Sequence, residues 1–348
     1  MNRKISILLA LFCAIFAHAQ TNGFEVKRLE LEGRLAWQGN WKDGKVNDEA
    51  TGFRGQFINL RFDAQIVKGL DIQYRQRFTK PSDQNFWDAT DFLRLNWQIN
   101  PKWDVSAGKQ IVLLGGREYD YAPIDTYQFS EFCNNIACYQ LGVSAGFRPS
   151  KNDYLQLQFI NSPLRQWAGN NSYAFNLYWS GQHGCWSPIW SFNLLEHQHR
   201  KWMTYFVLGN RFDFGPVHFH VDYMNRANAH QTFLFKDCSV MTEFGVQAHP
   251  ALKVLARYTY DVNRTGTDVD KLVQDGTEIH AALLGIEAEP LKNFRDWCRI
   301  FGTVGYSWGK NTNPDGILLD KSLNVQVGVK FKANILDGIA RLRKKHKD

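Results

Sequence analysis

Two pairs of histidines have the spacing of metal ligands. His218 and His220 fall on one face of an extended segment, and His197 and His199 repeat that spacing. Two imidazoles on one face can bind a transition metal when further ligands complete the site. Neither pair has a third ligand at a suitable spacing, so we expect no metal and no cofactor. We interpret these histidines as polar residues of the fold.

A second candidate chemistry is that of a serine nucleophile. The run Gly142-Val143-Ser144-Ala145-Gly146 has the spacing of the nucleophile turn of hydrolases. In such enzymes the serine lies between a strand and a helix, and a base is within hydrogen-bond reach. Here the run continues the alternation of a strand, and no helical pattern follows it. We therefore predict no catalytic residue, and a hydrolase remains only as an alternative.

Cysteine chemistry is limited by the odd number of cysteines. Five of the six cysteines follow Cys13, so they cannot all pair within one chain. Cys133 and Cys138 are the two that are close in sequence. Either a disulfide joins them or both remain thiols, and the spacing leaves both possibilities open.

The N-terminal residues 1–20 have the order of a secretory signal peptide. Two basic residues precede the apolar run Ile5–Phe16, and Ala17-His18-Ala19 supplies the small residues that signal peptidase requires. Cleavage lowers the formal net charge from +7 to +5, because it removes two basic residues and no acid. Much of the remaining excess lies in the tail 337–348, which we expect to be a basic periplasmic segment. An exported chain with a nearly neutral body is not expected to bind nucleic acid.

The sequence pattern of the rest of the chain is that of β-strands. From Leu29 to Ile335 apolar and polar residues alternate with a period of two, and turn residues interrupt the pattern roughly every eight to twelve residues. In the last segment Val327 shares one face with apolar residues, and Gln326 shares the other with polar residues. No apolar run after the signal peptide reaches the roughly 18 residues of a membrane helix. The pattern predicts an all-β fold over 21–336, a transmembrane antiparallel β-barrel of about sixteen strands.

The connections between these segments alternate in length. Lys68-Gly69 and Asn100-Pro101-Lys102 are tight turns, whereas 42–54, 115–138 and 262–277 are long polar excursions. Outer-membrane barrels have short periplasmic turns and long outer loops, and aromatic residues gather at both membrane interfaces, as they do near the strand ends here. A soluble sandwich has no reason to sort its loops by side. We therefore expect the bacterial outer membrane as the location, with its lipid and lipopolysaccharide around the barrel.

One stretch carries a family resemblance. Residues 88–116 contain the run ATDFLRLNWQINPKWDVSAGKQIVLLGG, in which a strand, an Asn-Pro turn and a second strand lead to a Gly-Gly pair. This pattern resembles the phosphate-selective porin O and P family of Gram-negative outer membranes. The resemblance implies a sixteen-stranded barrel, usually a homotrimer, whose third outer loop folds inward and narrows the pore. The matching loop here is 115–138.

The resemblance also implies where the pore residues lie. The charged residues of the loop, which we expect at the constriction, are Arg117, Glu118, Asp120, Asp125 and Glu131. The basic residues that we expect on the lumen wall are Arg34, Arg61, Arg75, Arg77, Arg94 and Lys109. Inward acids share this wall, namely Asp63, Asp71, Asp104, Asp222, Glu243 and Asp261. An acidic loop opposite a partly basic wall gives a transverse field, which is typical of a general diffusion pore rather than of a phosphate ladder.

These features together predict a porin that is not an enzyme. It would be a passive diffusion channel for small hydrophilic solutes or ions, with anions among the candidates. Two alternatives remain: a non-conducting structural or adhesive barrel, and an outer-membrane hydrolase. Barrels of sixteen strands usually enclose water, which favours the channel. The sequence leaves the solute, the pore radius, the direction of ion preference and the oligomeric state open.

Overall fold

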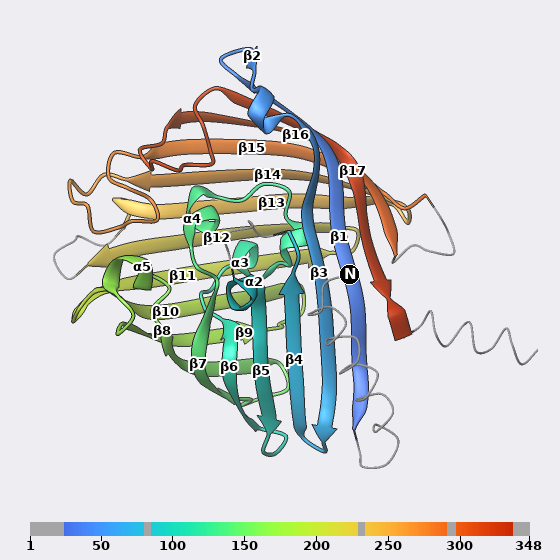
Figure 1. Ribbon diagram of the computed structural model, residues 1–348, viewed down its shortest axis with the longest axis vertical. Helices are drawn as coiled ribbons and strands as arrows, with labels where there is room; N and C mark the ends of the chain where they lie inside the picture. The colour runs from blue at the N-terminus through green and yellow to red at the C-terminus, as the bar shows by residue number, and fades with distance from the viewer. Residues whose placement is uncertain (1–23, 80–84, 229–233, 291–296, 337–348) are drawn as a thin grey trace, which may run out of the picture.

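A closed barrel of antiparallel strands forms the molecule (Figure 1). The computed structural model describes residues 24–79, 85–228, 234–290 and 297–336. Sixteen long strands follow one another around the barrel, and pairing between the first and the last closes it. Closure satisfies the ladder hydrogen bonds of every strand, which a membrane requires. The predicted signal peptide 1–20 and tail 337–348 lie outside the described residues.

The predicted strand pattern is confirmed. The long strands are β1 (Glu25–Lys42), β3 (Gly52–Val67), β4 (Leu70–Arg77), β5 (Thr90–Gln98), β6 (Trp103–Ile111), β7 (Tyr139–Phe147), β8 (Asp153–Asn161), β9 (Tyr173–Gly181), β10 (Trp186–Gln198), β11 (Lys201–Phe214), β12 (Val217–Asn228), β13 (Asp237–His249), β14 (Leu252–Asn263), β15 (Glu278–Ala288), β16 (Cys298–Lys310) and β17 (Ser322–Asn334). The short strand β2 (Lys45–Val46) and the turn η1 (Asp48–Ala50) lie in the loop after β1. The first strand begins at Glu25 and the last ends at Asn334, close to the range Leu29–Ile335 over which the alternation predicts strands.

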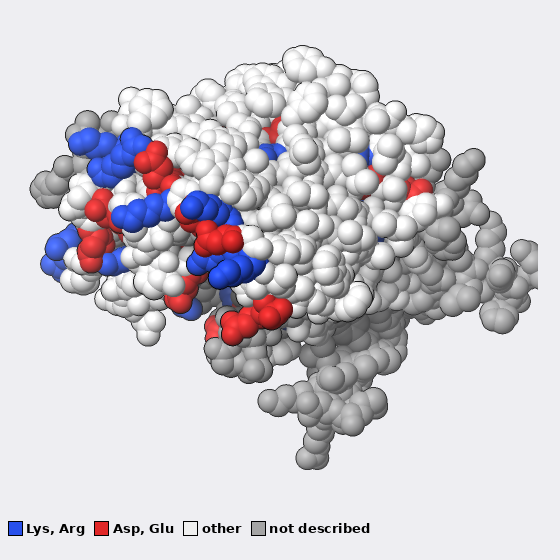
Figure 2. All heavy atoms as spheres, turned by 90° about the horizontal axis from the view of Figure 1, so that it is seen from above, with Lys and Arg blue, Asp and Glu red and all other residues white. Residues whose placement is uncertain are grey.

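The two faces of the strands differ as the alternation predicts. Val327 is 54% exposed on the outer surface, whereas its neighbour Gln326 is 7% exposed and points inward. Figure 2 shows a broad surface without charged residues, while Lys, Arg, Asp and Glu gather toward one end. An outer barrel surface of this kind matches the hydrocarbon region of a membrane. None of the helices in the described ranges is long and apolar enough to span a membrane.

The loop lengths also follow the expected order. The strands are joined by tight turns at one end of the barrel, and Gly69 and Gly215 adopt positive φ angles of 84° and 62° in two of them. Glycine adopts this conformation without steric cost. At the other end most connections are longer, and the longest runs from residue 112 to 138 between β6 and β7. Two connections depart from this order: 199–200 between β10 and β11 is short, and 289–297 between β15 and β16 is long.

Candidate functional site

The long connection 112–138, called loop L3 below, crosses the interior of the barrel. It contains two short helices, α3 (Arg117–Asp120) and α4 (Glu131–Asn135), and the turn η2 (Pro123–Asp125) between them. Figure 1 shows α3 and α4 within the circle of strands. L3 approaches the wall closely at Gly116, because a Cβ added to Gly209 of β11 would lie 2.6 Å from the Gly116 Cα atom. A side chain at Gly209 would push the loop off the wall, and Gly116 has a φ of 97°, which glycine adopts without steric cost.

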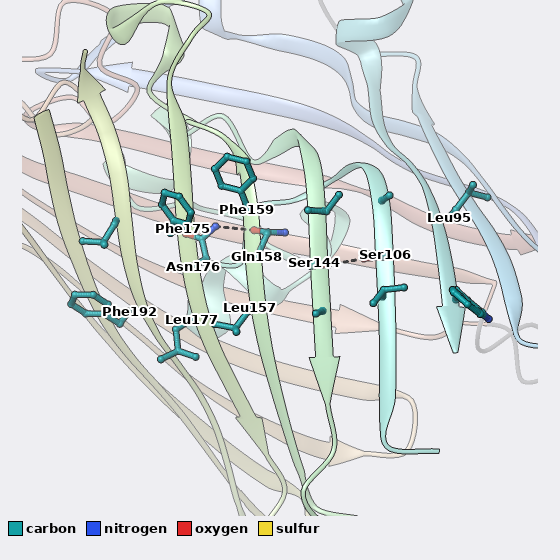
Figure 3. A pocket seen from close by; sticks show the side chains of 16 residues that line it. Leu95, Ser106, Ser144, Leu157, Gln158, Phe159, Phe175, Asn176, Leu177 and Phe192 are labelled. Carbon is teal, nitrogen blue, oxygen red and sulfur yellow. Dashed lines mark hydrogen bonds between the residues drawn. The ribbon is translucent and has the colours of Figure 1, made fainter. Parts of the chain in front are cut away.

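The start of L3 lies on a row of inward polar side chains. Gln158 Oε1 accepts the Leu113 N–H at 2.9 Å, and Asn193 Nδ2 donates to the Leu113 carbonyl at 2.8 Å. Figure 3 shows Gln158, Ser144 and Ser106 directed to one side of their strands, while Leu157 and Phe159 point to the other. The same strands therefore present a polar face to L3 and an apolar face outward.

The apolar face holds a groove of about 700 Å³ on β5–β10 (Figure 3). Its lining includes Leu95, Val143, Leu157, Phe175 and Phe192, which are all large exposed apolar residues. Such a surface suits lipid chains and not a hydrated solute. The channel must therefore be sought inside the barrel.

Wall carboxylates hold both helices of L3. Asp222 of β12 accepts the Glu118 N–H at 2.8 Å, and Asp261 of β14 accepts the Glu131 N–H at 2.8 Å. The first N–H groups of a helix have no partner within it, and a carboxylate is a favourable acceptor there. The sequence placed both aspartates among the lumen acids but did not predict this contact. The missed signal is that an inward loop needs acceptors from the wall.

Glu118 and Glu131 are buried contacts of the loop and do not face a solute path. Glu118 forms an ion pair with Arg257 of β14 and accepts the Ser130 N–H at 2.9 Å. Glu131 accepts the Leu318 N–H at 3.1 Å and the Asn313 side chain at 3.2 Å, both from the loop 311–321. Burial of a carboxylate is tolerated when it is paired or hydrogen-bonded. These two predicted constriction residues instead fasten L3 to its surroundings.

The turn η2 is held by β1 and β17. Arg34 is buried and donates to the Thr126 carbonyl at 2.8 Å, so it binds the loop and does not line an open path. Asp125 pairs with Lys330 at 2.9 Å. Burial raises the pKa of the Asp125 carboxyl, but the Lys330 ammonium and further nearby cations outweigh it and hold the pKa below the ordinary value.

A cavity lies between L3 and the wall of β3–β5. It has a volume of about 670 Å³ and is lined by four guanidinium groups on the wall and by Asp120 and tyrosines on the loop. The four arginines are Arg61, Arg75, Arg77 and Arg94. The cavity brings together these four residues of the predicted basic wall and one of the predicted loop charges, Asp120. Glu118 also borders the cavity, but its side chain is almost completely buried against Arg257 and Ser130.

Two of these arginines face each other directly. Arg61 and Arg75 are register partners in β3 and β4, and the Phe92 ring contacts the two guanidiniums at 5.7 Å and 5.0 Å. Like charges directly opposite each other destabilise a sheet unless other groups compensate them. Asp63 pairs with Arg61 at 3.2 Å, and Asp91 pairs with Arg75 at 2.9 Å. The wall therefore concentrates positive charge and offsets it only in part.

A second cavity continues the first toward the short turns. It has a volume of about 330 Å³ and reaches Asp104, Arg148 and Tyr154. The residues that line both cavities are Gln73, Arg94, Ile111, Tyr119 and Asp120. Arg94 and Asp120 are thus the two charged residues at the junction. Arg94 donates to the Gln73 amide oxygen at 2.8 Å, and the Asp120 side chain is 49% exposed.

The prediction that Lys109 lies on the lumen wall is wrong. Lys109 pairs with Leu93 on one side and Leu141 on the other, and both of these residues belong to the exposed outer row. Its ammonium group donates to the Trp87 carbonyl at 2.7 Å. Lysine can occupy an outward position near a membrane interface when its charged end reaches polar groups. The remaining loop charge, Arg117, donates to the Ser187 carbonyl on β10.

The residues considered above as metal ligands, as a nucleophile or as a disulfide make ordinary contacts within the barrel. His218 contacts Glu243 and His220 contacts Tyr121, and within the described ranges no cluster of three or more metal-ligating side chains occurs. Ser144 Oγ donates to Gln110 Oε1 at 3.0 Å, which is an amide and not a base. Cys133 and Cys138 are not joined by a disulfide.

Comparisons with known proteins agree with the fold. The family model of phosphate-selective porin O and P matches residues 17–185, which include the stretch 88–116. No curated protein matches the chain significantly. Among solved structures, the anion-selective porin from Comamonas acidovorans has a TM-score of 0.64 at 13% identity, covering 89% of this chain and 100% of that chain. Outer-membrane expressed OmpT of Vibrio cholerae has a TM-score of 0.61 at 13% identity, covering 90% and 99%. The outer membrane channel DcaP of Acinetobacter baumannii has a TM-score of 0.60 at 13% identity, covering 89% and 98%.

At these identities the solved structures establish the fold alone. The family model adds a match in sequence over residues 17–185. The resemblance to the family is therefore confirmed over residues 17–185. The chain has the sixteen-stranded barrel fold of the outer-membrane porins, and over residues 17–185 it matches the phosphate-selective porin O and P family.

Proposed function

We propose that this protein is a passive outer-membrane channel for small hydrophilic solutes, with a preference for anions. The observation that carries the proposal is the passage between L3 and β3–β5, where Arg61, Arg75, Arg77 and Arg94 line one side. A water-filled constriction lined mainly by guanidinium groups lowers the energy of an anion and raises that of a cation.

The charge balance at the junction supports this direction. Asp91 is shared between Arg75 and Arg77, so one carboxylate faces two guanidiniums. Among the described residues Arg94 forms no ion pair, and it donates a hydrogen bond to the neutral Gln73 amide. Asp120 is the exposed loop acid that lines the same cavity. The excess positive charge therefore remains available to a passing anion.

The arrangement of the charges suits conduction rather than tight capture. Register places Arg77, Arg75 and then Gln73 along β4, and Arg94 lies beside Gln73 on β5. Arg148 lies further along, in the second cavity. Several weak sites in series let an ion enter and leave, whereas one strong site would hold it. No chemical step is required of the protein, which is consistent with a channel and not an enzyme.

The first experiment is a planar-bilayer recording of the purified full-length protein. An open pore gives discrete conductance steps that scale with salt concentration. The non-conducting structural or adhesive barrel would give no steps although the protein is folded and inserted. A heat-dependent shift in gel migration provides the control for folding. Hydrolysis of lipid or ester substrates would favour the hydrolase, which the bonded state of Ser144 does not support.

We also propose the homotrimer that the family resemblance implies. The family match and the porin fold support it. Chemical cross-linking in detergent, read on an unheated gel, should give a species of three chains.

A further inference from the structure

A second outer loop also turns into the barrel. The connection 264–277 joins β14 to β15, and its Leu272 and Val273 are completely buried. They pack in one apolar cluster with Phe132 and Ile136 of L3. The wall residues of this cluster include Leu195, Met203, Tyr205, Val207 and Met224.

This cluster replaces water in one half of the lumen. Met203, Tyr205 and Val207 alternate along β11 and are fully buried, while Phe206 between them faces outward. Inward residues of a water-filled barrel are polar. An inward row of apolar residues indicates that the interior beside β10–β12 is packed with protein. The two connected cavities lie on the other side of L3, beside β3–β8, and a smaller cavity of about 220 Å³ lies beside β1, β16 and β17.

A buried ion pair fixes the second loop. Asp270 Oδ2 lies 2.8 Å from Arg226 Nε, and neither side chain is exposed to solvent. The other oxygen of Asp270 accepts the Leu272 N–H at 2.8 Å. Arg226 also pairs with Asp237 at 3.0 Å and lies 5.3 Å from the Phe132 ring of L3. One guanidinium thus contacts the wall, the second loop and L3.

Direct hydrogen bonds join the two loops as well. Asn135 of α4 donates to the Leu272 carbonyl at 2.8 Å, and Asn313 of the loop 311–321 donates to the same oxygen at 2.7 Å. Asn313 also contacts Glu131 of L3. Movement of the loop 264–277 out of the barrel would break these contacts together, and L3 would lose one of its supports.

We infer that the loop 264–277 positions L3 and closes the β10–β14 half of the lumen, so that solute passes only along the arginine-lined side. Asp270 and Arg226 are the positioning residues of this closure. The inference rests on the proposed channel function. It differs from an inward L3 alone, because it makes a second loop responsible for the size and the ion preference of the passage.

The test compares single-channel conductance and reversal potential of two matched variants. Asp270→Asn removes the charged contact between the loop and Arg226, which stays paired with Asp237, and so loosens the loop. Asp268→Asn changes the same residue type in the same loop, but its side chain is 89% exposed and pairs with Lys271. We expect Asp270→Asn to raise the conductance about twofold by opening a parallel path, with a weaker anion preference. We expect Asp268→Asn to match the wild type.

If Asp270→Asn does not fold, a second variant tests the inference. It lacks residues 267–275 and joins Gly266 directly to Gly276. Both glycines have positive φ angles at the base of the loop, so they can form a tight connection. The deletion should also raise the conductance. Wild-type or lower conductance in the folded variants overturns the inference, whereas absence of conductance in the wild type overturns the proposed function instead.

Discussion

Oδ2 of Asp222 accepts the backbone N–H of Glu118 at 2.8 Å, so a carboxylate of the barrel wall lies at the first turn of a helix inside the pore. Asp261 makes the equivalent contact with Glu131 at the second helix. A lumen acid that accepts from the loop cannot also act as an open charge in the solute path. The acids of β12 and β14 therefore hold L3 in place, and the proposed passage runs beside it along the arginines of β3–β5.

Asp222→Asn and Asp261→Asn should loosen L3. Each substitution weakens a hydrogen bond from a backbone N–H to a buried carboxylate, and a lost buried bond of this kind costs about 1–3 kcal/mol. We expect a lower midpoint of the heat-dependent gel shift and noisier single-channel currents. Asp315→Asn, in an exposed part of the loop 311–321, serves as the control. Equal effects in all three variants would argue against a specific role of the wall acids.

Val327→Arg and Gln326→Arg test the assignment of faces in β17. Arginine at the outward position should impair membrane assembly by about 2–4 kcal/mol, because the charge faces lipid. Gln326 points inward and donates to Asn324, so arginine there should be tolerated and should alter only conduction. Assembly is measured as the folded fraction in lipid vesicles. Similar assembly of the two variants would show that the faces are assigned incorrectly.

Arg94→Gln should reduce the anion preference. Arg94 lies at the junction of the two cavities, and the substitution removes its charge while it keeps a hydrogen-bonding side chain. The reversal potential in a potassium chloride gradient should move toward the cation-selective direction. Lys109→Gln is the matched control, since Lys109 occupies the outer row. A shift of the same size in the control would place Lys109 in the pore after all.

The anion preference should increase as the pH falls. Loss of water around the carboxyl raises the pKa of Asp120, an effect that Arg117 opposes only in part. Asp120 therefore becomes neutral at a higher pH than an ordinary aspartate, and its repulsion of anions disappears below that pH. Asp125 stays charged in the same range, because Lys330 and nearby cations lower its pKa.

Reversal potentials recorded as a function of pH, for the wild type and Asp120→Asn, check this expectation. The wild type should show a step that the variant lacks. A step that persists unchanged in Asp120→Asn would assign the titration to another group.

The strands were predictable because their signal is local. Alternation over nine residues, as in β7, fixes both the strand and its faces. The same alternation also places Lys109 with Trp103 and Val105 in the outer row of β6. Lys109 was assigned to the lumen because the family resemblance implies a basic wall, although the local alternation indicates the opposite face. The count of sixteen strands followed from the same repeats and the loop lengths.

The roles of the pore charges were harder to predict because they depend on contacts far apart in sequence. Glu118 pairs with Arg257, 139 residues away, and Arg34 binds the loop 92 residues away at Thr126. Sequence alternation shows that such residues point inward, but not whether they meet water or protein. The apolar inward row of β11 could have indicated a packed interior, since Met203, Tyr205 and Val207 are unusual lumen residues.

The reversal potential of the wild-type protein in a planar bilayer tests the central claim most directly. With concentrated potassium chloride on one side and dilute on the other, a channel lined by Arg61, Arg75, Arg77 and Arg94 should pass chloride faster than potassium. The dilute side should then become negative with respect to the concentrated side at zero current. A potential of the opposite sign, or a conducting pore with no potential, would contradict an anion-preferring passage along these arginines.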